Sequence, residues 1–119
     1  MYAEDDPLLL ALRPIALAFP EAAEKESHGR PTFFAGKVFA AYGVTEDHPH
    51  VLVFKPDPTD RDALLQDPRI LVPPYYGPGG WLALDLAAAP PDWAEVRELL
   101  DGSYRQIALK RMLKALAES

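Results

Sequence analysis

The chain has 119 residues, 49% of them hydrophobic, and it carries 12 lysines and arginines against 18 aspartates and glutamates. The net charge of -6 repels polyphosphates on average, which argues against broad, non-specific nucleic-acid binding. The absence of cysteine excludes disulfides, thiolate metal sites and a thiol nucleophile.

The N-terminal sequence MYAEDDP is acidic, whereas a secretory signal begins with positive charge and continues into an apolar run. The uncharged apolar runs of the chain are also shorter than a bilayer span. We therefore expect a soluble, cytoplasmic protein with no membrane partner.

The first predicted helix begins at Asp6 and Pro7, which suit an N-cap and a first-turn position. Its apolar residues recur at helical spacing: Leu8, Leu12, Ile15 and Phe19. Pro14 interrupts this pattern and is expected to kink or divide the helix, and Pro20 is expected to end it.

A charged connection, residues 21–30, is expected to lead into a β-hairpin. Two β-rich runs, residues 32–35 and 37–42, flank Gly36, where a tight turn would let them pair. A third strand, residues 50–55, is apolar on both faces, which is typical of a central or covered strand.

A short helix is predicted after Asp57, with Pro58 at its first position and Pro68 as its end. Residues 69–72 are predicted to form a short strand. Residues 81–86 alternate with three leucines on one face and form the next strand. The loop 73–81 joins these two strands.

The last helix is predicted to begin at Asp92, and Gly102 predicts a bend or a restart at Ser103. The order is helix, three strands, helix, two strands, helix. We therefore expect a single α+β domain over residues 1–119, in which helices cover an antiparallel sheet of about five strands.

Four ordered segments resemble the MmcQ/YjbR family: LRPIALAFPEAAE, HGRPTFFAGKVFA, VPPYYGPGGWLALDL and DWAEVRELLDGSYRQIALK. The similarity covers nearly the whole chain, from about Leu12 to Lys114. The resemblance implies a CyaY-like α+β fold with hairpins described as a double wing. Members of the family are commonly labelled DNA-binding on that structural ground, which is an analogy of shape. The acidic net charge of this chain departs from what the label needs.

The loop 73–81 is the first candidate site. Aromatic side chains stack on bases, and glycines let a backbone approach a ligand closely. The loop supplies both kinds of residue: Tyr75, Tyr76 and Trp81, with Gly77, Gly79 and Gly80. A structural interpretation competes, in which the glycines provide turn geometry and the rings cover the sheet.

Cations around the predicted hairpin are the second candidate. His28, Arg30 and Lys37 bracket it, Lys55 closes the next strand, and a wing tip carrying them would contact a phosphate backbone. Cations at strand ends are also a routine protection of sheet edges.

The C-terminal helix is the third candidate. Arg105, Lys110 and Arg111, followed by Lys114, could form a basic strip. The alternative is that cations in the last turns of a helix complement its macrodipole.

We find no catalytic motif, and the three histidines (His28, His48 and His50) lack the spacing of a metal site, so we expect no enzyme activity, no metal and no cofactor. The first hypothesis is a non-enzymatic protein that binds DNA or another nucleic acid through wing-like hairpins and the basic C-terminal helix. The alternative is a small-ligand or protein-interaction domain that uses the loop 73–81. Cations on one continuous face would favour the first hypothesis, and interleaved acids the second.

Overall fold

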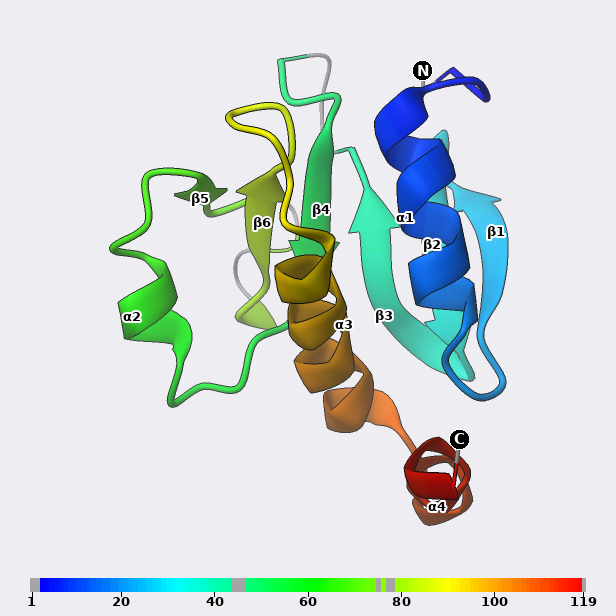
Figure 1. Ribbon diagram of the computed structural model, residues 1–119. Helices are drawn as coiled ribbons and strands as arrows, with labels where there is room; N and C mark the ends of the chain where they lie inside the picture. Colours follow the sequence, from blue (N-terminus) through cyan, green and yellow to red (C-terminus); the bar gives the residue numbers. More distant parts are fainter. Residues whose placement is uncertain (1–2, 44–46, 75, 77–78, 119) are drawn as a thin grey trace.

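The computed structural model describes residues 3–43, 47–74, 76 and 79–118 (Figure 1). The helices are α1 (Pro7–Leu17), α2 (Arg61–Leu64), α3 (Trp93–Ile107) and α4 (Lys110–Glu118). The strands are β1 (Ala23–Ser27), β2 (Arg30–Ala35), β3 (Lys37–Tyr42), β4 (Val51–Phe54), β5 (Ile70–Leu71) and β6 (Leu82–Asp85).

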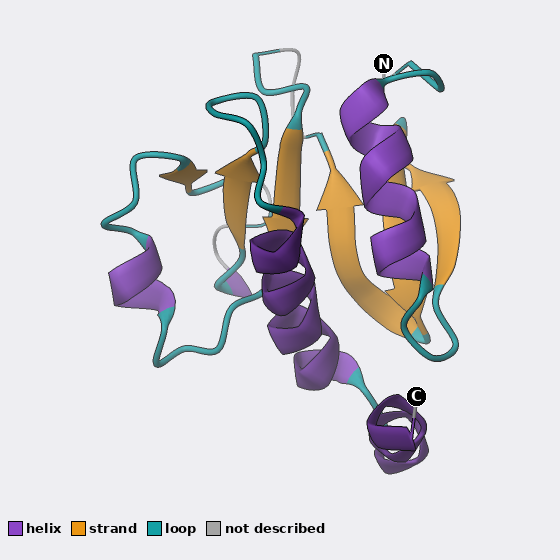
Figure 2. Cartoon of the chain, in the orientation of Figure 1, coloured by secondary structure: helices purple, strands orange, loops and turns teal. Residues whose placement is uncertain are grey.

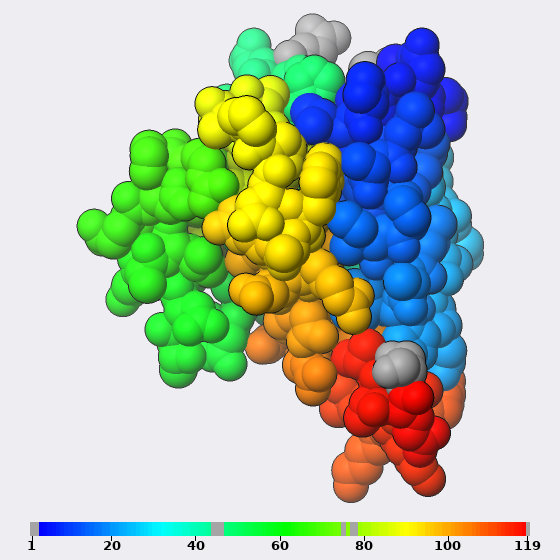
Figure 3. Space-filling view, in the orientation of Figure 1, coloured from blue at the N-terminus to red at the C-terminus, as the bar shows by residue number. Residues whose placement is uncertain are grey.

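The strands form one antiparallel sheet in the order β1-β2-β3-β4-β6-β5. Helices α1 and α3 lie side by side on one face, which we call the helical face, and α4 lies at the end of that layer (Figures 1 and 2). In the space-filling view these helices and the segment before α3 hide most of the sheet (Figure 3). The predicted α+β class with an antiparallel sheet is confirmed, and the described chain has six strands where about five were expected.

The main hydrophobic core lies between the helices and the sheet. Each described helix contributes apolar side chains to it, and Phe19, Phe39 and Tyr104 meet with ring centroids 5.0 to 5.9 Å apart. The Tyr104 hydroxyl donates a 2.8 Å hydrogen bond to the carbonyl of Pro20, so its polar atom is satisfied at the edge of the core.

Strand β3 contains a β-bulge in its pairing with β2, near one end of the sheet. Phe33 pairs with Ala40 and Phe34 pairs with Val38, so Phe39 is an extra residue in β3. Beyond the bulge, the Ser103 hydroxyl of α3 accepts a hydrogen bond from the backbone N–H of Lys55 and donates one to the carbonyl of Phe39. A helix side chain thus replaces a bond of the strand ladder.

The face opposite the helices, which we call the outer face, carries a second apolar cluster. One row of paired residues crosses all six strands on this face: Lys25, Thr32, Ala41, Val53, Ala83 and Leu71. Its four central members are buried, and the half-buried rings of Tyr76 and Trp81 pack against the cluster. No α-helix of the described chain lies over this face.

Several predicted elements need correction. Residues 23–27, expected as a charged connection, form the edge strand β1. This strand is stable despite its charges because alternate side chains find different partners: Glu24 binds Arg13 of α1, and Lys25 lies over the ring of Phe34. Charged residues are common on edge strands, where they prevent pairing with other chains.

The helix boundaries also differ from prediction. Helix α1 continues through Pro14 and ends at Leu17, before Pro20. Helix α2 begins at Arg61, because Asp57 instead accepts hydrogen bonds from the backbone and the hydroxyl of Thr59 in a preceding turn.

Helix α3 was expected to bend at Gly102, but it continues to Ile107, and Ala108 has extended backbone angles that separate it from α4. The break at this point turns α4 back, so that Met112 and Leu116 reach the main core.

Candidate nucleic-acid interface

The predicted hairpin cations lie at opposite ends of the sheet. His28 and Arg30 belong to the β1–β2 turn, where His28 and Gly29 both have positive φ, as in a type I′ hairpin turn. Lys37 follows Gly36, whose φ of 79° makes the β2–β3 turn at the other end. One wing tip therefore cannot present all three cations.

Carboxylates neutralise two of the predicted C-terminal cations. Arg105 binds Asp101 one turn earlier in α3, and Arg111 binds Glu21 at 2.9 Å. The bond to Arg111 lowers the pKa of Glu21. Lys110 is exposed on α4 and has no carboxylate partner within the described ranges.

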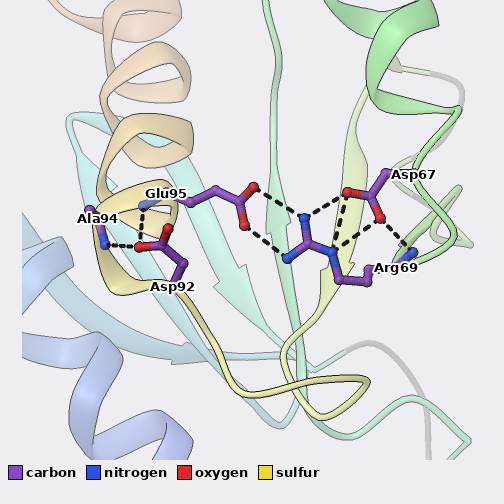
Figure 4. Close-up of polar contacts among 5 residues, drawn as sticks. All are labelled: Asp67, Arg69, Asp92, Ala94 and Glu95. Atoms are coloured by element: carbon purple, nitrogen blue, oxygen red, sulfur yellow. Dashed lines mark hydrogen bonds and ion pairs between the residues drawn. The ribbon is translucent and has the colours of Figure 1, made fainter.

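The helical side of the molecule holds two further arginines in ion pairs. Figure 4 shows Arg69 between Asp67 and Glu95, with nitrogen–oxygen distances from 2.6 to 3.2 Å. The same view shows Asp92 capping α3 through the backbone N–H groups of Ala94 and Glu95. The second, Arg13 of α1, binds Glu24 of β1 and Glu4. These arginines connect elements to one another and are already paired with acids.

Three cations share the outer face. Lys25 stands in the row that crosses the sheet, Arg30 lies two residues before Thr32 of that row, and Lys55 lies two residues after Val53. Since residues i and i+2 of a strand share a face, Lys25 and Arg30 are directed away from the helices. The same alternation, continued one residue beyond β4, places Lys55 on that face. No carboxylate of the described residues pairs with any of the three.

Most acidic residues of the strands lie on the helical face, opposite the cations of the outer face. Glu24 and Glu26 alternate with Lys25 along β1 and therefore lie on the helical face. On the described strands, Asp85 of β6 is the one acid on the outer face. Among the strand cations, Lys37 pairs with the core residue Ala35 and so lies on the helical face. Apart from Lys37 and Asp85, the strands carry their cations on the outer face and their acids on the helical face.

Aromatic rings accompany the outer-face cations. Phe34 lies two residues after Thr32 and is partly exposed, and the Lys25 ammonium lies 5.8 Å from the centre of its ring. Tyr76 and Trp81 meet with centroids 5.6 Å apart at an interplanar angle of 60°. Continuing the pairing of Phe54 with Leu82 brings Lys55 opposite Trp81.

Two positions of the loop 73–81 have backbone geometry that favours glycine. Gly80 has a φ of +87°, and a Cβ on Gly79 would lie 3.1 Å from the Trp81 ring. Tyr75 and Gly77, which were also candidates, lie outside the described residues. The rings of Tyr76 and Trp81 pack over the apolar cluster of the outer face, so they cover the sheet as the structural interpretation of this loop predicts. Both rings keep part of their surface exposed.

A shallow hollow of about 350 Å³ lies on the exposed side of α3, lined by Ala94, Arg97, Glu98 and Asp101. It belongs to the helical side and not to the loop 73–81, so it gives no support to a ligand pocket at that loop. No cluster of three or more metal-ligating side chains occurs in the part of the chain that the structure describes. Within the same part, each helix is too short or too polar to cross a bilayer.

Lys25 and Phe34 were not among the predicted site residues. The sequence contains the signal for Lys25, because EKE alternates in charge, but only a strand converts that alternation into two faces. Phe34 adjoins Phe33 in the sequence, and the burial of Phe33 in the main core sends Phe34 to the outer face.

The family model described as YjbR matches residues 17–106. The chain belongs to the YjbR family. The family resemblance stated from the sequence is therefore confirmed. Among solved structures, the Deinococcus radiodurans protein DR2400, with a domain of the family model DUF419, is similar at a TM-score of 0.70 and 24% identity. The match covers 89% of this chain and 85% of that chain, and at this identity it shows the fold alone. No curated protein matches the chain.

Proposed function

We propose that this YjbR-family chain is a non-enzymatic binding protein that holds nucleic acid on the outer face of its sheet. The observation that carries the proposal is the separation of charge across the sheet. Lys25, Arg30 and Lys55 share the outer face with the single strand acid Asp85. On the helical side, four arginines are paired with carboxylates: Arg13, Arg69, Arg105 and Arg111.

The net charge of -6 is compatible with this proposal because salt screens distant charges. At an ionic strength of 0.1 M, the screening length is about 10 Å. A nucleic-acid strand on the outer face would lie against its cations, while the sheet separates it from the acids of α3, which covers the other face (Figure 1). Local attraction can then exceed the repulsion from the rest of the molecule.

The proposal keeps part of the interface expected from the sequence and relocates the rest. Arg30, Lys55, Tyr76 and Trp81 remain in it. The basic C-terminal helix does not, because Arg111 is bound to Glu21 and α4 packs on the helical side.

The test is fluorescence anisotropy of labelled oligonucleotides over a salt series. Three phosphate contacts should make the logarithm of the binding constant fall with the logarithm of salt at a slope of about 2 on single strands and about 3 on duplex. Amide chemical shifts should change in β1, in β2 and at Lys55, and stay unchanged in α1. No binding at low salt, or shifts confined to α4, would contradict the proposal.

A further inference from the structure

A second row of residues crosses the outer face near the β2–β3 turn. It consists of Phe34 of β2, its partner Val38 of β3, Lys55 after β4 and Trp81 before β6. We call it the aromatic row. An aromatic ring lies near each end of the row. Lys25 lies over the ring of Phe34, and Lys55 and Trp81 adjoin the paired residues Phe54 and Leu82 on neighbouring strands.

We propose that the aromatic row binds single-stranded nucleic acid, with bases stacked on Phe34 and Trp81 and phosphates held by Lys25 and Lys55. This inference rests on the proposed function and specifies its ligand. Rings stack on any base, since every base has a π-face, and cations beside them follow the backbone. A duplex keeps its base faces hidden, so it could use only the cations.

The contact between Lys25 and Phe34 indicates how a base would enter. In the free protein the ammonium lies over the ring at 5.8 Å, which is a weak interaction at an exposed site. A phosphate attracts the ammonium more strongly than the ring does, because it is a full negative charge. Once Lys25 turns towards a phosphate, the face of Phe34 is free for a base.

Neighbouring residues fix the orientation of the Trp81 ring in the free protein. Tyr76 meets the indole ring edge to face, and the Gly79 backbone lies so close that an added Cβ would fall 3.1 Å from it. A ring fixed in this way loses little conformational freedom on binding. The indole stays partly exposed and is therefore accessible to a base.

The distance between the two rings sets the length of the ligand. Phe34 and Trp81 lie on strands separated by three strand spacings, which is about 14 Å. Neighbouring stacked bases are too close together to reach both rings. A strand of several nucleotides must cross the sheet, within the range of about 4 to 16 nucleotides that such platforms bind.

The experiment uses the fluorescence of Trp81. The chain has two tryptophans, and Trp93→Phe exchanges one ring for another at a half-buried position of α3, leaving Trp81 as the only tryptophan. The variant is titrated at low salt with oligothymidylates of about 4 to 16 nucleotides and with duplexes of matching length. We expect saturable quenching of Trp81 by the single strands and no quenching by the duplexes.

Phe34 variants separate stacking from charge. Phe34→Leu should weaken single-strand binding about 5- to 100-fold while leaving the salt slope unchanged, and Phe34→Tyr should restore it. Equal binding of single strand and duplex, without quenching of Trp81, would overturn this inference and leave the proposed function standing. No binding of either nucleic acid at low salt would remove both.

Discussion

At the scale of single residues, Asp6 connects the start of α1 to the sheet. Its Oδ1 accepts a hydrogen bond from the Leu8 backbone, and its Oδ2 accepts one from the Tyr42 hydroxyl at 2.7 Å and lies 3.0 Å from His50 Nδ1. Burial raises the pKa of Asp6, but the hydrogen bonds from Tyr42 and Leu8, together with the charge of His50, outweigh it and lower the pKa below its ordinary value. The carboxylate is therefore an ionised, structural group.

Tyr42→Phe tests the hydrogen bond to this carboxylate. The substitution removes a donor from a buried, charged acceptor, so we expect the free energy of unfolding to fall by about 1–3 kcal/mol in urea titrations. Tyr76→Phe is the matched control, because the hydroxyl of Tyr76 has no partner in the described structure. An equal loss in the two variants would show that the bond to Asp6 contributes nothing.

The pH dependence of stability tests the charge of Asp6. The pKa of Asp6 in the folded protein lies below its ordinary value of 3.8. The ionised carboxylate therefore adds to the free energy of unfolding above pH 3.8, and this contribution is lost as the pH falls through the folded pKa. Asp6→Asn keeps an oxygen for the N-cap but cannot ionise. We expect the stability difference between the two proteins to shrink as the pH falls from about 5 to about 2.

Unfolding midpoints measured over that pH range provide the check. Other carboxylates with lowered pKa values, those of Glu21, Asp57 and Asp67, should keep part of the acid sensitivity in the variant. A stability difference that stays constant with pH would contradict a lowered pKa for Asp6.

At the scale of elements, Ser103 joins α3 to two strands, and its neighbour Gly102 gives a control of opposite sign. Ser103→Ala leaves the N–H of Lys55 and the carbonyl of Phe39 without their partner, so we expect a loss of about 1–3 kcal/mol in the free energy of unfolding. Gly102→Ala should instead stabilise by up to about 1 kcal/mol, because its Cβ would meet nothing within 4 Å. Urea unfolding of both variants measures these changes. A Ser103→Ala protein as stable as the parent would show that the two hydrogen bonds of Ser103 do not stabilise the fold.

The elements also show how far the sequence could predict the fold. A run that is apolar on both faces predicted β4, and apolar alternation predicted β6, each to within one residue at either end. Gly36 marked its turn correctly. Strand β1 was missed because its residues are charged and its two faces have different partners, which only tertiary structure supplies. The break between α3 and α4 falls at Ala108, where neither glycine nor proline marks it.

The candidate site was predictable to a similar extent. Residue type alone identified Arg30, Lys55 and Trp81 as candidates. It could not place Lys37 at the opposite end from Arg30, nor show that Arg105 and Arg111 are bound by acids, because those partners are set by packing. Phe34 could be assigned to the outer face only once β2 was known to be a strand, because side chains alternate between the two faces of a strand.

At the scale of the whole molecule, the described helices and the main core lie on one side of the sheet, and the outer face is left to strands and one loop. This asymmetry lets an acidic protein present a basic and aromatic surface. It also makes the outer face and α4 competing sites for an anionic polymer, with cations on each.

The measurement that decides between them compares two double variants of equal charge. Lys25→Gln/Lys55→Gln removes two outer-face cations, and Lys110→Gln/Lys114→Gln removes two from α4. Binding to a labelled single-stranded oligonucleotide is measured over a salt series. We expect the salt slope to fall from about 2 to about 0.7 in the outer-face variant and to stay at about 2 in the α4 variant. An unchanged slope in the outer-face variant, or a reduced one in the α4 variant, would contradict the account.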